Sequence, residues 1–258
     1  MLGAIVGDIV GSIYEFDNHR SKDFPLFQDH CQFTDDTILT VATADALMTD
    51  QDFASKYRSY GKKYPSSYGG FFRRWIFDKS QGPYNSFGNG SAMRVSPVAW
   101  AFDTEEEVLA MAKASSIVTH DHPEGIKGAQ ATAVAIFWAR NGKTQTEIVR
   151  DVEAMFGYDI STPIDEIREF YKFDVTCQGT VPEALRCFLE AEGFEDAIRN
   201  AISIGGDSDT LAAITGSIAE AKWGVPEEIR REALGRLDAE LVSTFNKFAK
   251  IISSQLSG

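Results

Sequence analysis

Hydrophobic residues recur every three to four positions along most of the chain, which is the period of an α-helix and not the alternation of a β-strand. We therefore expect an all-α fold. The expected helices cover residues 36–49, 51–63, 68–79, 104–117, 123–140, 144–155, 180–191, 194–202, 208–222 and 226–253, with loops over 17–34, 80–91 and 156–179. Because no Pro-, Gly- or Ser-rich linker separates these segments, we expect residues 1–258 to form a single domain.

The opening segment, MLGAIVGDIVGSIYEF, also has a helical pattern, and its glycines at positions 3, 7 and 11 share one face. Glycine inside a helix costs about 1 kcal/mol relative to alanine, so this bare face predicts close contact with a second helix. Asp8 interrupts the apolar run, which argues against a signal peptide and is typical of a buried, hydrogen-bonded structural acid. The spacing is not GxGxxG, so a dinucleotide fingerprint is excluded.

The composition is that of a globular protein, with 43% hydrophobic residues in 258. The chain has 25 Lys and Arg against 38 Asp and Glu, a net charge of −13, which disfavours nonspecific binding to nucleic acid or to an anionic membrane. No apolar run approaches the roughly 18 residues of a membrane span. The three cysteines lack CxxC spacing and predict neither a disulfide framework nor a zinc site. We expect a cytoplasmic monomer.

Two acidic clusters, FTDDT at 33–37 and GGDSDT at 205–210, each precede an apolar helical run. Helix capping explains one acid per helix well and the second acid poorly. Together the clusters supply hard oxygen ligands, which Mg²⁺, Mn²⁺ and Ca²⁺ prefer, and Gly205 and Gly206 permit a turn that aims the acids into one space. The pattern predicts two bridged cations about 3.5–4 Å apart. The predicted metal ligands are Thr34, Asp35, Asp36, Asp207, Asp209 and Thr210.

Three further stretches are candidates for ligand contacts. Glu15 lies seven residues after Asp8, on nearly the same side if the first helix continues that far, although it is equally explained as an exposed surface acid. The loop SFGNGSAMR at 86–94 leads into a helix, and its backbone N–H groups can hold a phosphate without a basic residue. In VTHDHP, His120 and His122 can donate to a phosphate or ribose, or can cap neighbouring backbone.

With these motifs assembled, the sequence resembles the ADP-ribosylglycohydrolase family, which includes dinitrogenase-reductase-activating glycohydrolase and the human ADP-ribosyl hydrolases. The resemblance runs from GAIVGDIVGSIYEF through FTDDT, FGNGSAMRVSP and THDHPEG to IGGDSDTLAAITGSIAEA, and its text is most similar to the subgroup active on serine-linked ADP-ribose. It implies an orthogonal helical bundle with two Mg²⁺ or Mn²⁺ ions in a central cleft. It also implies hydrolysis of an N- or O-glycosidic bond that joins ADP-ribose to a protein side chain or a small molecule, with release of ADP-ribose.

The resemblance implies metal-binding roles for the six residues of the two acidic clusters. It assigns Glu15 to catalysis. If Glu15 proves idle or structural, a metal-bound water beside Asp35 or Asp36 takes the catalytic role, so we name both aspartates as candidate catalytic residues as well. Phe87 takes the place of an aromatic residue that stacks on adenine, and His120 that of a histidine that holds ADP-ribose. The residues matched to substrate binding are Ser86, Phe87, Gly88, Asn89, Gly90, Ser91, Met93 and His120. The chain is short for the family and lacks long insertions around the cleft, so the acceptor is not transferred with the resemblance.

Two alternatives stay open. One is a catalytically idle ADP-ribose-binding protein, which needs the phosphate-binding loop but not the metal ligands or Glu15. The other is a haloacid-dehalogenase-type phosphatase, because DSDT at 207–210 resembles the DxDxT motif. That motif belongs at the end of an apolar strand near the N-terminus, whereas this one opens a helix near the C-terminus.

Overall fold

The computed structural model describes residues 1–65 and 68–256, and within these residues every regular element is a helix. The only strand-like feature in this part of the chain is an isolated bridge between Gly88 and Thr176. The all-α prediction is therefore confirmed. The helices are α1 (Leu2–Gly11), α2 (Asp35–Met48), α3 (Phe53–Lys63), α4 (Gly70–Phe77), α5 (Gly90–Met93), α6 (Val98–Ala101), α7 (Glu105–Ile117), α8 (Pro123–Arg140), α9 (Gln145–Phe156), α10 (Ile164–Phe170), α11 (Cys177–Leu189), α12 (Phe194–Ser203), α13 (Ser208–Trp223), α14 (Glu227–Gly235) and α15 (Ala239–Leu256).

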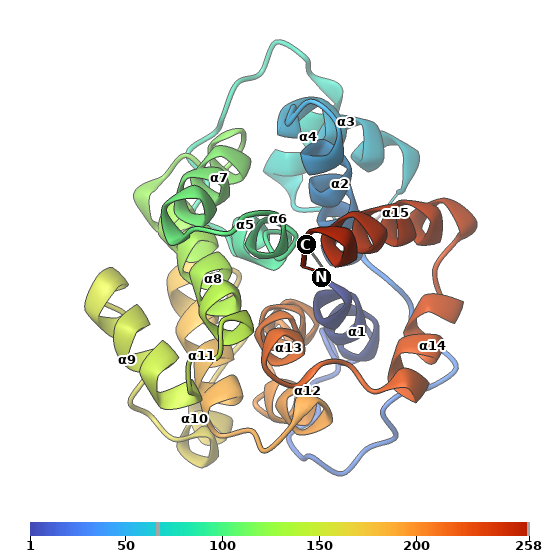
Figure 1. Cartoon of the computed structure of the whole chain (residues 1–258). Helices are drawn as coiled ribbons and strands as arrows, with labels where there is room; N and C mark the ends of the chain where they lie inside the picture. Colours follow the sequence, from blue (N-terminus) through green and yellow to red (C-terminus); the bar gives the residue numbers. More distant parts are fainter. Residues whose placement is uncertain (66–67, 257–258) are drawn as a thin grey trace.

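Helices α1 and α13 lie side by side in the middle of the molecule, and the other helices surround them (Figure 1). The glycine face of α1 explains how close they are. A Cβ added at Gly3 would lie 2.0 Å from the carbonyl oxygen of Gly216, and one at Gly7 would lie 2.0 Å from that of Ala212. The predicted contact between a bare helix face and a second helix is thus confirmed, and it brings the first motif against the last one.

Asp8 connects this central pair to the start of α2. Its carboxylate is fully buried and accepts hydrogen bonds from the backbone N–H groups of Thr34 (2.9 Å) and Thr37 (3.0 Å) and from the Thr34 hydroxyl (2.6 Å). These donors belong to the first turn of a helix, where N–H groups lack partners within the helix. Asp8 is therefore the buried structural acid that the sequence predicts, and it fixes the FTDDT segment beside α1.

Several predicted boundaries are wrong. The helix predicted at 180–191 is α11, which begins at Cys177, and α6 falls in no predicted helix. The predicted helix over 226–253 is two helices, because Gly235 ends α14 and the Asp238 carboxylate then accepts from the N–H groups of Glu240 and Leu241 as an N-terminal cap. The expected loop 156–179 contains α10. The first helix ends at Gly11, so Glu15 lies beyond it rather than on it. No helix in the described part of the chain is long and apolar enough to cross a membrane.

Candidate active site

A cavity of about 330 Å³ collects most of the predicted site residues from both ends of the chain. It lies where α2, α5 and α13 begin, beside the turn that follows α1. The predicted residues that line it are Glu15, Asp35, Asp36, Ser86, Gly88, Asn89, Gly90, Met93, His120, Asp207, Asp209 and Thr210. Residues that are about 170 positions apart in the sequence therefore meet in one place, as the two acidic clusters predict.

The carboxylates form two overlapping groups. One oxygen each from Asp8, Asp36 and Asp209 lie within 4.8 Å of one another, and so do oxygens from Glu15, Asp207 and Asp209. Asp209 belongs to both groups. This sharing is what a pair of neighbouring cations with a bridging carboxylate requires.

Crowding and burial change how these acids titrate. Burial, reinforced by the neighbouring carboxylates, raises the pKa of Asp36 and of Asp209 well above its usual range. Burial, followed by repulsion from Asp207, Asp35 and Asp8, raises the pKa of Glu15 to about 7. A divalent cation among these oxygens would favour the ionised forms and would reverse the shifts.

The donor set fits a hard divalent cation. All the acids in the two groups offer carboxylate oxygens, and one of them, Oδ1 of Asp36, is buried with no hydrogen-bond partner among the described residues. A buried polar atom without a partner is costly unless a ligand supplies one. Asp36, Asp207 and Asp209 with Glu15 could therefore hold Mg²⁺ or Mn²⁺, while Asp8 already accepts three hydrogen bonds.

Glu15 is tied to the second acidic cluster through Asn18. The Asn18 amide donates to the carbonyl oxygens of Tyr14 (2.8 Å) and Gly206 (2.9 Å), and its oxygen accepts from the N–H of Gly206 (2.8 Å). Gly205 and Gly206 have φ values of +71° and +80°, which L-residues with a side chain rarely adopt. The predicted glycine turn is therefore present, and one side chain links it to the turn that carries Glu15.

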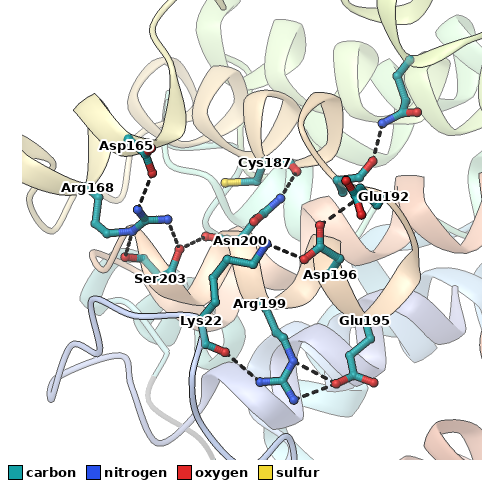
Figure 2. Close-up of polar contacts among 12 residues, drawn as sticks. Lys22, Asp165, Arg168, Cys187, Glu192, Glu195, Asp196, Arg199, Asn200 and Ser203 are labelled. Atoms are coloured by element: carbon teal, nitrogen blue, oxygen red, sulfur yellow. Dashed lines mark hydrogen bonds and ion pairs between the residues drawn. The ribbon is translucent and has the colours of Figure 1, made fainter.

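The segment after Glu15 is held against α12. Arg199 donates to the carbonyl oxygens of Lys22 (2.9 Å) and Phe24 (2.7 Å), and Lys22 pairs with Asp196 (Figure 2). Arg20 donates to the carbonyl oxygens of Ile204 (2.9 Å) and Tyr171 (2.6 Å). These bonds hold residues 20–24 beside α12 and the Ile204 end of the turn that carries Asp207.

The loop at 86–91 has fewer available N–H groups than its sequence indicates. The N–H of Gly88 donates to the Ser86 hydroxyl (3.1 Å), and that of Asn89 donates to the carbonyl oxygen of Val175 (2.8 Å). The Asn89 side chain donates to Asp207 Oδ2 (2.7 Å) and to the Thr180 hydroxyl (3.1 Å). The expectation of a purely backbone phosphate cradle is therefore wrong for these two positions, and Asn89 instead connects the loop to the acidic cluster.

Comparisons with known proteins identify the family. The family model described as ADP-ribosylglycohydrolase matches residues 1–256. The chain belongs to the ADP-ribosylglycohydrolase family. This membership confirms the resemblance and the predicted class of enzyme, a glycosidic-bond hydrolase.

Individual members of the ADP-ribosylglycohydrolase family align over most of the chain. Human ADP-ribosylhydrolase ARH3 is 25% identical, and the alignment covers 94% of this chain and 90% of that protein. ADP-ribosylarginine hydrolase Tri1 of Pseudomonas putida is 24% identical over 90% of this chain and 73% of its own length. A solved structure titled ADP-ribosylglycohydrolase-related protein complex superposes with a TM-score of 0.68 at 23% identity, covering 94% and 96% of the two chains, and this likeness shows the shared fold.

Three residues predicted from the family resemblance do not line the cavity. Thr34 donates its hydroxyl to Asp8 and accepts from the N–H of Asp36, so it caps α2. Ser91 is buried and donates to the carbonyl oxygen of Gly125 (2.7 Å). Phe87 is 44% exposed and its ring centroid lies 5.3 Å from that of His122, although its neighbours Ser86 and Gly88 both line the cavity. Its stacking on adenine stays a prediction.

Sequence reasoning missed the aromatic and cationic part of the lining. Phe71, Phe72, Tyr84 and Arg94 all contribute to the wall, and the rings of Phe71 and Tyr84 stack with centroids 6.0 Å apart. Phe71 is 62% exposed, but other phenylalanines of this chain such as Phe16 and Phe77 are exposed as well, so no signal in the sequence distinguished it as a lining residue. Arg94 is the last residue of the 86–94 stretch, but the sequence predicted only backbone contacts for that stretch, and only the fold reveals that the Arg94 side chain is buried.

Proposed function

We propose that this chain is a metal-dependent ADP-ribosyl hydrolase that cleaves the bond between ADP-ribose and an acceptor and releases ADP-ribose. The observation that carries this proposal is the shared position of Asp209 in two carboxylate groups, in the same cavity as the 86–91 loop and His120. The match over residues 1–256 supports a single catalytic domain. We further propose that it acts as a monomer in the cytoplasm, where its three buried, unpaired cysteines would stay reduced.

The cations would be Mg²⁺ or Mn²⁺, held by Asp36, Asp207 and Asp209 with Asp35 and Thr210 at the same wall. When bound they would neutralise the acids and polarise the ribose hydroxyls and a water molecule. Thr34 would then support the site as the cap of α2, since its hydroxyl hydrogen is used by Asp8.

Glu15 is the residue we assign to proton transfer. It lines the cavity, is partly buried, and lies outside the two threonine–carboxylate clusters, so it is placed to give or take a proton at the bound ligand. Cleavage develops positive charge at the anomeric carbon, which nearby carboxylates stabilise electrostatically. Ser86, Gly90 and His120 would hold the diphosphate and ribose, and the exposed rings near the cavity would receive the adenine.

The acceptor is a separate question. The name of the Tri1 relative specifies ADP-ribosylarginine, whereas the name ARH3 specifies no acceptor. The motifs are most similar to those of the serine-linked subgroup, but this similarity does not identify the acceptor of this chain.

The test is a panel of defined conjugates that carry ADP-ribose on arginine, serine or acetate, incubated with Mg²⁺, Mn²⁺ or a chelator and assayed for free ADP-ribose. We expect metal-dependent release from at least one conjugate. Tight binding of ADP-ribose without release from any conjugate would indicate the idle binding protein instead.

A further inference from the structure

Arg94 is a buried cation in the wall of the cavity. Its side chain is 0% exposed, and the Nε and Nη1 atoms have no hydrogen-bond partner in the described part of the chain. The guanidinium carbon lies 4.1 Å from the ring centroid of Tyr57, a cation–π contact. The one short hydrogen bond that Arg94 donates goes from Nη2 to the hydroxyl of Thr119, at 2.8 Å.

Thr119 also connects Arg94 to His120 through its hydroxyl group. Its hydroxyl oxygen lies 2.7 Å from Nδ1 of His120, which is within hydrogen-bond distance. The histidine backbone is fixed as well, because its N–H donates to the carbonyl oxygen of Ser116 (2.8 Å) and its own carbonyl oxygen accepts from the Ser116 hydroxyl (2.9 Å). Arg94, Thr119 and His120 therefore form a continuous chain of contacts that ends at the cavity.

The donors and acceptors define a direction along this chain. A guanidinium can only donate, so Arg94 occupies one lone pair of the Thr119 oxygen. A second hydrogen bond joins this hydroxyl to Nδ1 of His120 at 2.7 Å, and Arg94 has no lone pair to accept the hydroxyl hydrogen. The hydroxyl hydrogen of Thr119 is then left to donate, and Nδ1 of His120 is its acceptor.

The protonation of the imidazole agrees with this direction. Burial, together with the charge of Arg94, holds the pKa of His120 well below its usual range, so the ring is neutral near pH 7 and carries one N–H. If Nδ1 accepts, that hydrogen is on Nε2. Nε2 has no partner among the described residues and faces the loop, since a Cβ added at Gly90 would lie 3.1 Å from it.

We propose that Arg94 and Thr119 hold His120 in the tautomer that is protonated at Nε2, so that His120 donates a hydrogen bond to an anionic or hydroxyl oxygen of the ligand in the cavity. The assignment of that ligand as ADP-ribose rests on the proposed function, whereas the tautomer is a property of the free protein. Arg94 and Thr119 act through His120 and are positioning residues. The position of the His120 ring also requires a small residue at position 90, because a side chain there would crowd Nε2.

The tautomer can be measured directly in the free wild-type protein. Long-range proton–nitrogen correlation spectra of ¹⁵N-labelled protein distinguish a protonated from an unprotonated ring nitrogen, and His120→Gln identifies which signals belong to this histidine. We expect a protonated Nε2 and an unprotonated Nδ1 at neutral pH. A protonated Nδ1, or a doubly protonated ring, would overturn the proposal.

Variants at Thr119 test the cause. Thr119→Val keeps the shape but removes the hydroxyl, and we expect a mixture of tautomers, an ADP-ribose dissociation constant that is about tenfold higher, and a raised KM with kcat little changed. Thr119→Ser should restore the wild-type spectrum and affinity. Thr132→Val is the matched control, because Thr132 is a fully buried threonine whose hydroxyl has no partner among the described residues.

The outcomes separate this proposal from the proposed function. If Thr119→Val folds and keeps both the wild-type spectrum and the wild-type affinity, the positioning role is wrong. If wild-type protein binds no ADP-ribose and yet shows the Nε2 tautomer, which Thr119→Val loses, the positioning role stands and the proposed function fails.

Discussion

Two walls of the cavity bury charge in opposite ways. The acidic wall, which consists of Glu15, Asp36, Asp207 and Asp209, brings carboxylates together without a basic side chain among them. The cationic wall, formed by Arg94 with Thr119 and His120, buries a guanidinium that makes its hydrogen bonds to neutral groups. Each wall carries a charge that the other described residues beside it do not neutralise.

The two walls also differ in how they can relieve this charge. Carboxyl groups can take up protons, and their raised pKa values show that the metal-free fold favours this. Arg94 instead depends on the Tyr57 ring and on the Thr119 hydroxyl. Divalent cations would neutralise the acidic wall, and an anionic diphosphate would neutralise the cationic wall. This charge complementarity supports the proposed function.

The largest expected effect follows from removing the shared carboxylate. Asp209→Ala takes one oxygen ligand from each group and leaves the remaining acids repelling one another. We expect no measurable ADP-ribose release and a large loss of metal affinity by calorimetry. Asp103→Ala, at a residue whose side chain is 85% exposed, is the control. Full activity of Asp209→Ala would remove the basis for a two-cation site.

Glu15→Gln tests the proton-transfer role within the acidic wall. The amide keeps the size of the side chain but cannot act as a base, so turnover should fall by about 10²-fold or more while ADP-ribose affinity changes little. Glu183→Gln is a matched control, because burial also raises the pKa of Glu183 to about 7, although this residue does not line the cavity. Single-turnover assays measure the rate of cleavage, and calorimetry measures the affinity for ADP-ribose separately. Equal turnover in wild type and Glu15→Gln would mean that Glu15 is idle.

The aromatic residues near the cationic wall should show a moderate effect. Phe87→Ala removes the ring predicted to stack on adenine, and Phe71→Ala removes an exposed ring that lines the cavity. A stacking contact is worth on the order of 1–3 kcal/mol, so at least one variant should weaken ADP-ribose binding by that amount. Phe77→Ala, at a 66% exposed phenylalanine, provides the comparison. Unchanged affinity in both variants would mean that adenine binds elsewhere.

The smallest effect is a pH dependence of thermal stability. Because the pKa values of these acids are raised by folding, protonation stabilises the folded metal-free protein. This contribution is fully present below about pH 4, the ordinary range of a free carboxyl group. It is lost as the pH rises through the pKa values of the folded state, about 7 for Glu15. Cations compete with protons for these oxygens. One fixed cation concentration, about 100 times the dissociation constant at pH 8, should raise the melting temperature by roughly 5–10 °C at pH 8 and by less at pH 5, where protons weaken cation binding. An equal rise at both pH values would contradict this linkage.

The sequence predicted the acidic wall better than the cationic one. Glycines at positions 3 and 7 predicted the contact of α1 with another helix, and paired acids at two helix starts predicted their meeting, because both features are costly without a partner. Arg94 and Tyr84 carried no such local signal, since their positions depend on how the 80–94 segment packs against α3, α4 and α7 in three dimensions. The contact of the Phe87 ring with His122, in place of a position in the cavity lining, likewise depends on packing rather than on the motif.

Calorimetric titration of Mn²⁺ or Mg²⁺ into chelator-treated protein tests the central claim most directly, in the presence and absence of ADP-ribose. For the wild type, the two unneutralised walls predict cation binding that ADP-ribose strengthens, and for Asp209→Asn they predict weak binding with no such coupling. Cation binding that is absent from the wild type, or identical in the wild type and Asp209→Asn, would contradict the assignment of the acidic wall as the metal site.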